Sequence, residues 1–265
     1  MIRFIHITDT HVRGAAGFEL YGRNAFAYLE TLVDHLNRHT FPIDFVLHTG
    51  DVVDDRSEAA YHLAKTALSK LRYPIYYVAG NHDDPAALRR VLLNNSSEND
   101  LGGRFDYSFS LKGITFAVFD SRGERDPAGW LSEEQLAALR TLCTADGPPL
   151  VIVLHHPPLP LDSQWIDHGA ALALMLVENH AAFRAAIAPA RGRLRGVFFG
   201  HIHRAYQAYH EGILYASAAS ALAQLESYPE QPYPNTAPDE PAGYSIVTMT
   251  GETTILRHIF LRLPS

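Results

Sequence analysis

Short apolar runs alternate with longer segments of helical periodicity along most of the chain, and this alternation constrains the fold more than any other feature. Most of the runs are apolar enough to be buried on both faces, as strands in the middle of a sheet are. The predicted strands cover residues 3–7, 44–47, 75–78, 107–110, 114–119, 150–154, 197–199, 213–215, 244–249 and 253–259.

Helical patterns lie between these strands, at residues 24–39, 58–71, 85–93, 132–142 and 170–188. Ser57 and Ser132 stand at the start of two of them, where a hydroxyl can accept a hydrogen bond from a free backbone N–H. Strands that alternate with helices pack in layers, with the strands parallel to one another. We therefore predict an α/β fold with a layered core.

Residues 204–265 depart from this rhythm, because they combine short strands with a segment rich in Pro and Tyr at 227–243. The prolines of that segment exclude regular structure, and a long loop in a compact domain is either functional or loosely ordered. At 265 residues the chain has the length of one α/β unit, so we expect a single domain over 1–265. The 227–243 loop is a candidate cap over a site or a candidate part of an oligomer interface.

The amino-acid composition excludes several kinds of site and partner. The chain has 15 histidines but a single cysteine, Cys143, which excludes an internal disulfide framework and a thiolate-rich metal site. The net charge of -7 provides no general attraction to phosphate backbones, so a nucleic-acid polymer is not an expected partner. No apolar segment has the length of a signal-peptide core or a membrane span, which predicts a cytoplasmic protein without a membrane partner.

Polar clusters follow directly after five of the predicted strands: Asp9-Thr10-His11, Gly50-Asp51, Gly80-Asn81-His82-Asp83, His155-His156 and Gly200-His201-Ile202-His203. In an open α/β sheet, the loops that leave the carboxyl ends of the strands converge on one edge, where sites form. A pair such as Gly-Asp is common by chance, whereas Gly-Asn-His-Asp is expected roughly 0.002 times in a chain of this composition. The order of the five clusters along the chain and their positions at strand ends therefore predict that they form one site.

The residue types in these clusters indicate metal chemistry. Carboxylate, carboxamide and imidazole groups together form a ligand set suited to Fe, Mn, Zn or Co rather than to Ca²⁺. Seven candidate ligands with one bridging Asp match two ions with four protein ligands each, which leaves positions for water and substrate. Two such ions can generate a hydroxide near neutral pH and stabilise an in-line displacement at phosphorus.

The ordered series Asp-x-His, Gly-Asp, Gly-Asn-His-Asp, His and Gly-His-x-His, over residues 9–203, resembles the signature of the calcineurin-like metallophosphoesterases. Further stretches are similar to a narrower group, the bacterial class III cyclic nucleotide phosphodiesterases and glycerophosphodiesterases. These stretches are Leu20-Tyr21-Gly22, Tyr73-Pro74-Ile75-Tyr76 and the run from His155 to Leu161. The resemblance implies a four-layer α/β/β/α sandwich of two mixed sheets flanked by helices.

The resemblance also implies roles for individual residues. One metal ion would be held by Asp9, His11, Asp51 and His203, and the second by Asp51, Asn81, His155 and His201, with Asp51 as the bridge. The catalytic residues would be Asp51 and His82. The histidine that matches His82 binds no metal in the family and lies beside the scissile phosphate, where it stabilises charge or protonates the leaving oxygen. Relatives form dimers or larger assemblies, which implies a homo-oligomer.

Acidic residues and one histidine beside the clusters have a structural interpretation. Adjacent residues at a strand end face opposite ways, so we expect His156 to pack next to the site. Asp83 and Asp84 precede a helix whose N-terminus favours carboxylates, and capping is their expected role. Asp54 and Asp55 are expected to serve the next helix likewise, although a carboxylate there could also alter substrate preference.

Cationic and aromatic residues near the clusters are expected to be structural too. Arg13 and Arg204 lie within reach of a substrate phosphate, but we expect them at the solvated surface. The expected solvated turn before residue 197 contains Arg191, Arg193 and Arg195. Trp130 and Trp165 are expected to pack, with Trp165 near enough to line a pocket wall.

The motifs predict the reaction type but leave the substrate open, because the family hydrolyses monoesters, diesters and nucleic acids with nearly the same ligands. Lys and Arg are sparse beside the ligands, whereas a dianionic monoester usually recruits them. We predict a dinuclear-metal phosphodiesterase that hydrolyses small diesters, cyclic nucleotides or glycerophosphodiesters, by in-line attack of a metal-bound hydroxide. The alternatives are a phosphomonoesterase or phosphoprotein phosphatase and, more remotely, a non-catalytic scaffold, which would have lost ligands that this chain retains.

Overall fold

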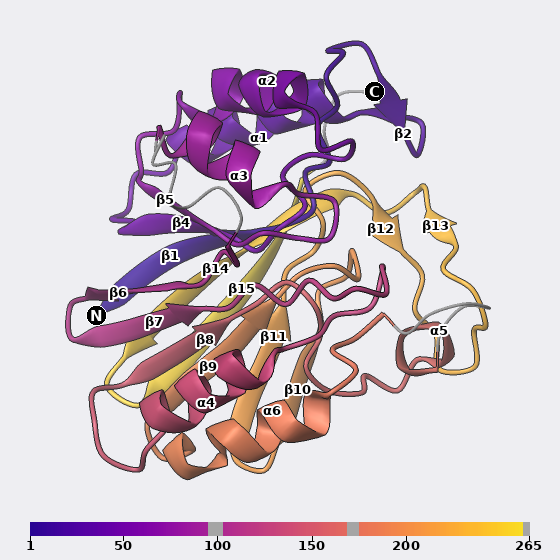
Figure 1. Cartoon of the computed structure of the whole chain (residues 1–265). Helices are drawn as coiled ribbons and strands as arrows, with labels where there is room; N and C mark the ends of the chain where they lie inside the picture. The colour runs from indigo at the N-terminus through magenta and orange to yellow at the C-terminus, as the bar shows by residue number, and fades with distance from the viewer. Residues whose placement is uncertain (95–102, 169–174, 262–265) are drawn as a thin grey trace.

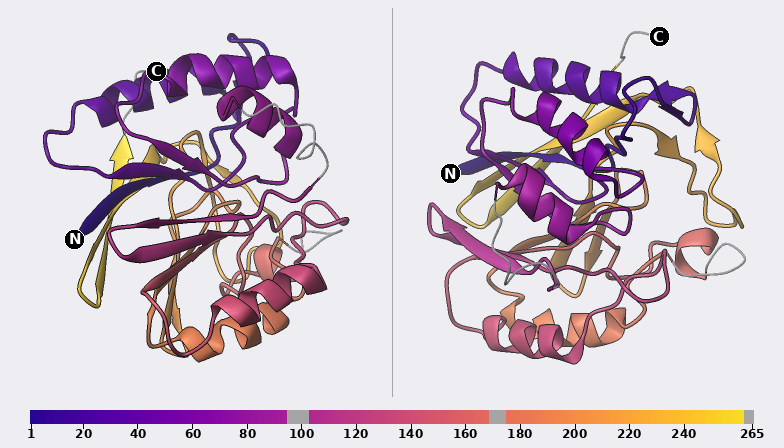
Figure 2. Two further views of the ribbon diagram at one scale, coloured as in Figure 1. Left: turned by 60° about the vertical axis from the view of Figure 1, so that its left-hand side comes forward. Right: turned by 45° about the horizontal axis from the view of Figure 1, so that its top comes forward.

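The computed structural model describes residues 1–94, 103–168 and 175–261, which form four layers (Figure 1). Two sheets lie face to face in the middle, one of five strands and one of six, and helices cover the outer side of each (Figure 2). The predicted α/β/β/α sandwich of mixed sheets is therefore confirmed. Among the residues that the structure describes, no helix is long and apolar enough to cross a membrane.

The five-stranded sheet has the order β15-β14-β1-β4-β5. Its strands β1 (Ile2–Ile7), β4 (Phe45–His48) and β5 (Ile75–Tyr77) are parallel, and β14 (Ala242–Thr250) and β15 (Thr253–Leu261) extend it in antiparallel pairing. The helices on its side of the molecule are α1 (Ala25–Asn37), α2 (Glu58–Leu68) and the short α3 (Pro85–Ala87), which continues as a π-helical turn over Leu88–Leu92 (Figure 1).

The six-stranded sheet has the order β10-β11-β9-β8-β7-β6. Its four central strands are parallel: β7 (Ile114–Val118), β8 (Leu150–Val153), β9 (Leu194–Phe199) and β11 (Ile213–Ser217). The antiparallel edge strands are β6 (Tyr107–Leu111) and β10 (Gln207–His210). The outer side carries α4 (Glu133–Leu142) and α6 (His180–Ile187), which ends in a 3₁₀ turn over Ala188–Ala190.

In the part of the chain that the structure describes, two short strand pairs and one short helix lie apart from these four layers. They are the hairpin of β2 (Glu19–Leu20) with β3 (Arg23–Asn24), the pair of β12 (Gln224–Leu225) with β13 (Thr236–Ala237), and the short helix α5 (Gln164–Asp167). The 227–243 loop is thus irregular except for β13 and for the first residues of β14.

Aromatic side chains fill the space between the two sheets. The Phe4 ring stacks on Phe45 with centroids 4.9 Å apart and meets Phe198 of the other sheet edge-on at 5.5 Å. Phe45 in turn meets Phe116 at 5.3 Å. Because side chains alternate along a strand, the neighbouring Ile5 points the other way, into the apolar layer under α1. Burial on both faces explains why these strands have apolar sequences.

Each predicted strand forms, and three predicted caps are confirmed. The Ser57 hydroxyl accepts from Ala60 N at 3.1 Å, Ser132 forms a capping box, and Asp84 accepts from Ala86 N at 2.8 Å. These signals are local in the sequence, which is why the pattern of residues reveals them.

The helix predicted over 170–188 is wrong over residues 175–179. Residues 169–174 lie outside the described residues, and the helix begins only at His180. Before it, the chain pairs with a distant segment: Gly129 N donates to Leu176 O, and Glu178 N donates to Gly129 O. These long-range backbone bonds replace the helical ones between residues 175 and 179, where Leu176 and Val177 are buried. The edge strand β10 and the helix α5 were not predicted, since both are short and of mixed polarity.

Arg193 is not part of a solvated turn. Only 8% of its surface is exposed, whereas Arg191 lies exposed two residues earlier. Its guanidinium donates to Leu142 O at the end of α4, to Thr144 O at 2.9 Å and to Pro148 O at 2.8 Å. A buried cation therefore satisfies carbonyls that α4 leaves free at its C-terminus.

We predict that Arg193→Ala lowers the free energy of unfolding by about 2 kcal/mol or more, because it leaves several buried carbonyls without a donor. The matched control is Arg191→Ala, which removes an exposed arginine of the same turn and should stay within about 0.5 kcal/mol of wild type. Urea denaturation measures both values. Similar stabilities of the two variants would show that the carbonyls find other donors.

Candidate metal centre

The loops after β1, β4 and β9 bring one group of predicted ligands together. His11 Nε2 lies 2.9 Å from His203 Nε2 and 3.6 Å from Asp51 Oδ2. Asp9 Oδ1 lies 3.8 Å from His203 Nε2. All four side chains are buried, with no more than 4% of any residue exposed. They are the four residues predicted for the first ion.

The loops after β4, β5, β8 and β9 bring the second group together. His155 Nε2 lies 3.3 Å from Asp51 Oδ2, 3.2 Å from Asn81 Oδ1 and 3.1 Å from His201 Nδ1. Asp51 therefore lies between the two groups and contacts a histidine of each through the same oxygen. The structure thus unites every residue of the predicted ligand set.

The backbone of most of these residues adopts the left-handed conformation, which is rare outside glycine. The φ angles are 55° at Asp9, 47° at His11, 53° at Asp51, 72° at His201 and 49° at His203. Such residues cost free energy and persist where the surrounding structure holds them, which is typical of functional sites. The conformation directs the ligand side chains back toward the junction of the sheets.

The glycines of the motifs are required by close approach. A Cβ at Gly80 would lie 2.1 Å from Asp51 Oδ1, and one at Gly50 would lie 2.3 Å from His155 Nδ1. A Cβ at Gly200 would lie 2.0 Å from Thr8 Oγ1. Any side chain at these positions would displace a ligand or the strand end next to it.

Hydrogen bonds to main-chain carbonyls select the tautomer of two histidines. His155 Nδ1 is 2.7 Å from Thr49 O, and His203 Nδ1 is 3.0 Å from Ala223 O. A carbonyl can only accept, so each Nδ1 carries the proton and donates it. In the neutral ring, Nε2 then offers its lone pair toward the other ligands, as metal-binding histidines do.

The residues present fit metal ions bound by nitrogen and oxygen. Two buried atoms of the cluster, Asp9 Oδ2 and His201 Nε2, have no hydrogen-bond partner among the described residues. One ligand atom each from Asp9, His11 and His203 lie within 4.8 Å of one another, and so do those of Asp9, Asp51 and His155. Imidazole lone pairs directed at each other and at carboxylates are compatible when a cation lies between them.

Charge in the cluster is unevenly distributed. Burial raises the pKa of Asp9 to about 6 and lowers the pKa of His203 to about 3. Burial alone would lower the pKa of His155, but the carboxylates of Asp51 and Asp9 raise it to about 9. Protons therefore occupy part of the site in the absence of a cation, and metal binding must displace them.

Asp54 belongs to the site and does not cap a helix. Its carboxylate is 3.2 Å from His11 Nδ1 and accepts from Arg13 Nε at 2.5 Å. Burial opposes ionisation, but these two hydrogen bonds lower the pKa of Asp54 to about 2. Asp55 does lie at the helix start, where it accepts from Ser57 N at 3.1 Å. The signal that could have identified Asp54 is its position three residues after Asp51, the predicted bridge.

His82 is held differently from the predicted ligands. Its backbone N donates to Asp51 Oδ1 at 2.9 Å, and its Nδ1 is 3.0 Å from the main-chain oxygen of Asp54, to which it donates. The side chain is 41% exposed. Its ring lies at the edge of the cluster, 5.0 Å from the ring of His11 between centroids.

Asp83 does not cap a helix as predicted, because its carboxylate joins two loops. Its carboxylate accepts from Gly80 N at 2.9 Å, from Val52 N and Val53 N at 3.3 Å, and from Tyr61 Oη at 3.0 Å. It thereby ties the loop after β5 to the loop after β4.

His156 packs beside the site, as predicted. It is fully buried, and its Nδ1 is 2.8 Å from Ser121 Oγ. Its ring lies 4.5 Å from the ring of His201 between centroids.

The two arginines near the ligands were expected at the solvated surface; they are 37% and 22% exposed, and each is paired with a carboxylate. Arg13 bonds Asp54 and lies over the Phe18 ring at 4.1 Å from its centroid. Arg204 donates to both carboxylate oxygens of Glu240, at 2.5 and 2.9 Å. The second pair joins the residue after His203 to the 227–243 loop.

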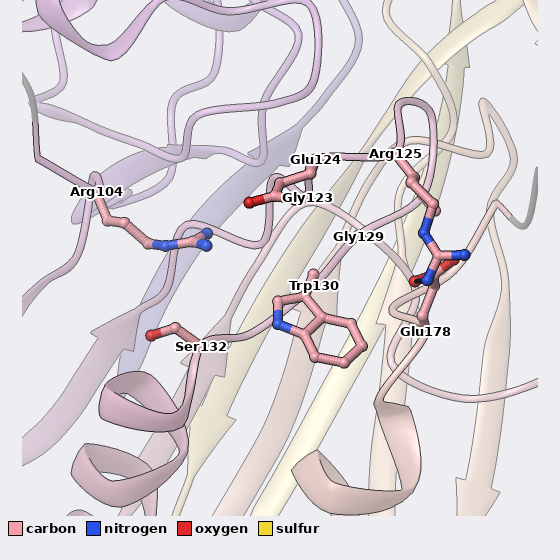
Figure 3. A pocket seen from close by; sticks show the side chains of 9 residues that line it. Arg104, Gly123, Glu124, Arg125, Gly129, Trp130, Ser132 and Glu178 are labelled. Atoms are coloured by element: carbon pink, nitrogen blue, oxygen red, sulfur yellow. Dashed lines mark hydrogen bonds and ion pairs between the residues drawn. The ribbon is translucent and has the colours of Figure 1, made fainter.

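A cavity of about 420 Å³ is lined by Trp130, which is 43% exposed and therefore not a packing residue (Figure 3). Figure 3 shows its indole between Ser132 and the Arg125–Glu178 ion pair. Trp165, in contrast, is fully buried and donates its Nε1–H to Glu226 O. A second cavity of about 330 Å³ shares Gly123 and Ala128 with the first and extends to Asn81.

Comparisons with known proteins agree with this geometry. The family described as calcineurin-like phosphoesterase matches residues 2–205. A 3′,5′-cyclic-nucleotide phosphodiesterase of Nostoc sp. is 27% identical over 230 residues, 85% of this chain and 80% of the relative. The glycerophosphodiester phosphodiesterase GpdQ of Enterobacter lignolyticus is 32% identical over 170 residues, 61% of this chain and 59% of the relative.

A solved structure has the same fold. A dimetal phosphatase from Danio rerio superposes with a TM-score of 0.68 at 17% identity, over 97% of this chain and 95% of that one. The family match spans most of the chain and every cluster of the site. The chain therefore belongs to the calcineurin-like phosphoesterase family, and the prediction of a phosphoesterase is confirmed.

Proposed function

We propose that the protein is a dinuclear-metal phosphodiesterase. Asp9, His11, Asp51 and His203 would hold one ion, and Asp51, Asn81, His155 and His201 the other. The observation that carries this proposal is the position of Asp51 Oδ2, 3.6 Å from His11 Nε2 and 3.3 Å from His155 Nε2. A carboxylate between two groups of convergent ligands is suited to bridge two ions.

Transition-metal ions such as Fe, Mn, Zn or Co, when bound there, supply Lewis-acid activation of water and of the phosphoryl oxygens. All seven proposed ligands are buried, so the protein shields their donor atoms from bulk solvent. Asp51 also accepts from the His82 backbone N, so the bridging carboxylate positions the loop that carries the proposed catalytic histidine.

His82 is proposed to stabilise charge on the phosphoryl group or to protonate the leaving oxygen. It is 41% exposed while the ligands around it are buried, so it is accessible to a substrate. Its Nδ1 donates to Asp54 O, which leaves Nε2 for the substrate. The ring is thereby fixed in orientation without being a ligand.

The proposed substrates are small phosphodiesters, cyclic nucleotides or glycerophosphodiesters. The names of the relatives from Nostoc sp. and Enterobacter lignolyticus support this class. The pairing of Arg13 with Asp54 and of Arg204 with Glu240 supports it too, since neither arginine carries an uncompensated charge for a dianionic monoester. A homo-oligomer, and a role of the 227–243 loop as a cap or an interface, stay predictions.

Substitution of Asn81 and of His82, each by alanine, should separate metal binding from catalysis. Asn81→Ala removes a proposed ligand, so the content of bound manganese should fall from two ions per chain toward one. His82→Ala should retain both ions and lower kcat roughly 10²- to 10⁴-fold, the usual contribution of a general acid. Elemental analysis measures the metal content, and steady-state kinetics on the same manganese-loaded samples measure kcat. Equal metal loss in both variants would contradict the division of roles.

A matched pair of nitrophenyl esters tests the substrate class. We expect kcat/KM for bis(p-nitrophenyl) phosphate to exceed that for p-nitrophenyl phosphate by about tenfold or more, or roughly 1.4 kcal/mol of transition-state stabilisation. The same protein should then hydrolyse one of cyclic AMP, a 2′,3′-cyclic nucleotide or a glycerophosphodiester in manganese. A preference for the monoester would indicate a phosphatase. Full metal content without hydrolysis of any ester would indicate a binding scaffold.

A further inference from the structure

The side chain of Asn81 presents two chemically different ends to two different neighbours. Its Oδ1 is 3.2 Å from His155 Nε2, inside the cluster. Its Nδ2 donates to Asp126 Oδ1 at 2.9 Å, on the side of the smaller cavity. Only the oxygen of a carboxamide can bind a cation, because the NH₂ group is a donor without a free lone pair. The orientation of this amide therefore decides whether Asn81 can be a ligand.

We propose that Asp126 is a positioning residue for the second metal ion. Its carboxylate accepts the Asn81 amide hydrogen and so directs Asn81 Oδ1 toward the ion. This inference rests on the proposed function, in which Asn81 is a ligand. Asp126 itself contacts no proposed ligand atom and comes from the loop between β7 and α4, outside all five sequence motifs.

The chemistry of Asp126 permits only one orientation of the amide. An ionised carboxylate accepts hydrogen bonds and donates none, so it pairs with the NH₂ end and repels the oxygen end. A rotation of the Asn81 amide by 180° would bring two oxygens together and turn the NH₂ group toward the ion. Both changes are unfavourable, and the contact with Asp126 therefore makes the ligand orientation the stable one.

Arg56 links the same two residues through a second path. Its Nη2 donates to the main-chain oxygen of Asn81 at 2.5 Å and lies 3.8 Å from Asp126 Oδ2. The backbone and the side chain of Asn81 are thus held by opposite charges that face each other. Arg56 and Asp126 are 57% and 58% exposed, whereas Asn81 is 7% exposed. Because water competes for an exposed carboxylate, we expect an effect at the lower end of the 10- to 100-fold range for such partners of metal ligands, about tenfold.

The test is a titration of the metal-free full-length protein with Mn²⁺, followed by isothermal calorimetry, for wild type and four variants. Asp126→Ala should weaken binding of the second ion about tenfold and leave the first unchanged. Asp126→Asn retains an oxygen that can accept the same hydrogen bond and should stay within about threefold of wild type. Glu124→Ala removes an equal charge from an exposed position of the same loop and should have no effect.

The fourth variant, Asn81→Ala, separates this inference from the proposed function. Normal binding of two ions by Asn81→Ala would refute the ligand assignment itself. Weak second-ion binding by Asn81→Ala together with wild-type binding by Asp126→Ala would refute only the positioning role. Equal losses in Asp126→Ala, Asp126→Asn and Glu124→Ala would reveal a general charge effect and overturn the proposal, as would loss of both ions from Asp126→Ala.

Discussion

The close approach of the two sheets at the carboxyl ends of β1 and β9 is the constraint on which the site depends. Gly200 lies so near Thr8 that no side chain fits between them, and His201 N donates to Asp9 Oδ1 at 3.2 Å across the junction. Ser220 Oγ donates to Asp9 O from the far side. Closely packed aromatic rings between the two sheets support the strands that carry the proposed ligands.

This junction collects groups that a protein interior normally excludes. Buried carboxylates and neutral imidazoles are costly unless each finds a partner, and here several partners are other ligands. Hydrogen bonds offset part of this cost: main-chain carbonyls accept from Nδ1 of His155 and of His203, and the Asp54 carboxylate bonds Nδ1 of His11. Cation binding and folding are therefore coupled, since a cation completes interactions that the polypeptide leaves open.

The sequence predicts those parts of the molecule whose determinants are local or ordered along the chain. Strand positions, the caps at Ser57 and Ser132, and the convergence of residues that follow strand ends all have such determinants. Asp54 and Asp83 could not be assigned in this way, because Asp54 meets a histidine 43 positions earlier and Asp83 meets backbone 30 positions earlier. The helix prediction for the residues just before His180 failed for the same reason, since their hydrogen-bond partner is the distant Gly129. Such contacts join loops that are far apart in the sequence, and the spacing of apolar residues along the chain carries no information about them.

The left-handed backbone at the proposed ligands has a consequence for the evolution and engineering of this fold. Glycine adopts that conformation without steric cost, so a glycine at His11 or His203 would relieve strain in the same step that removes a proposed ligand. Relief of backbone strain and retention of the proposed ligands therefore oppose each other at these positions. A bound cation, which completes interactions that the polypeptide leaves open, would offset that strain.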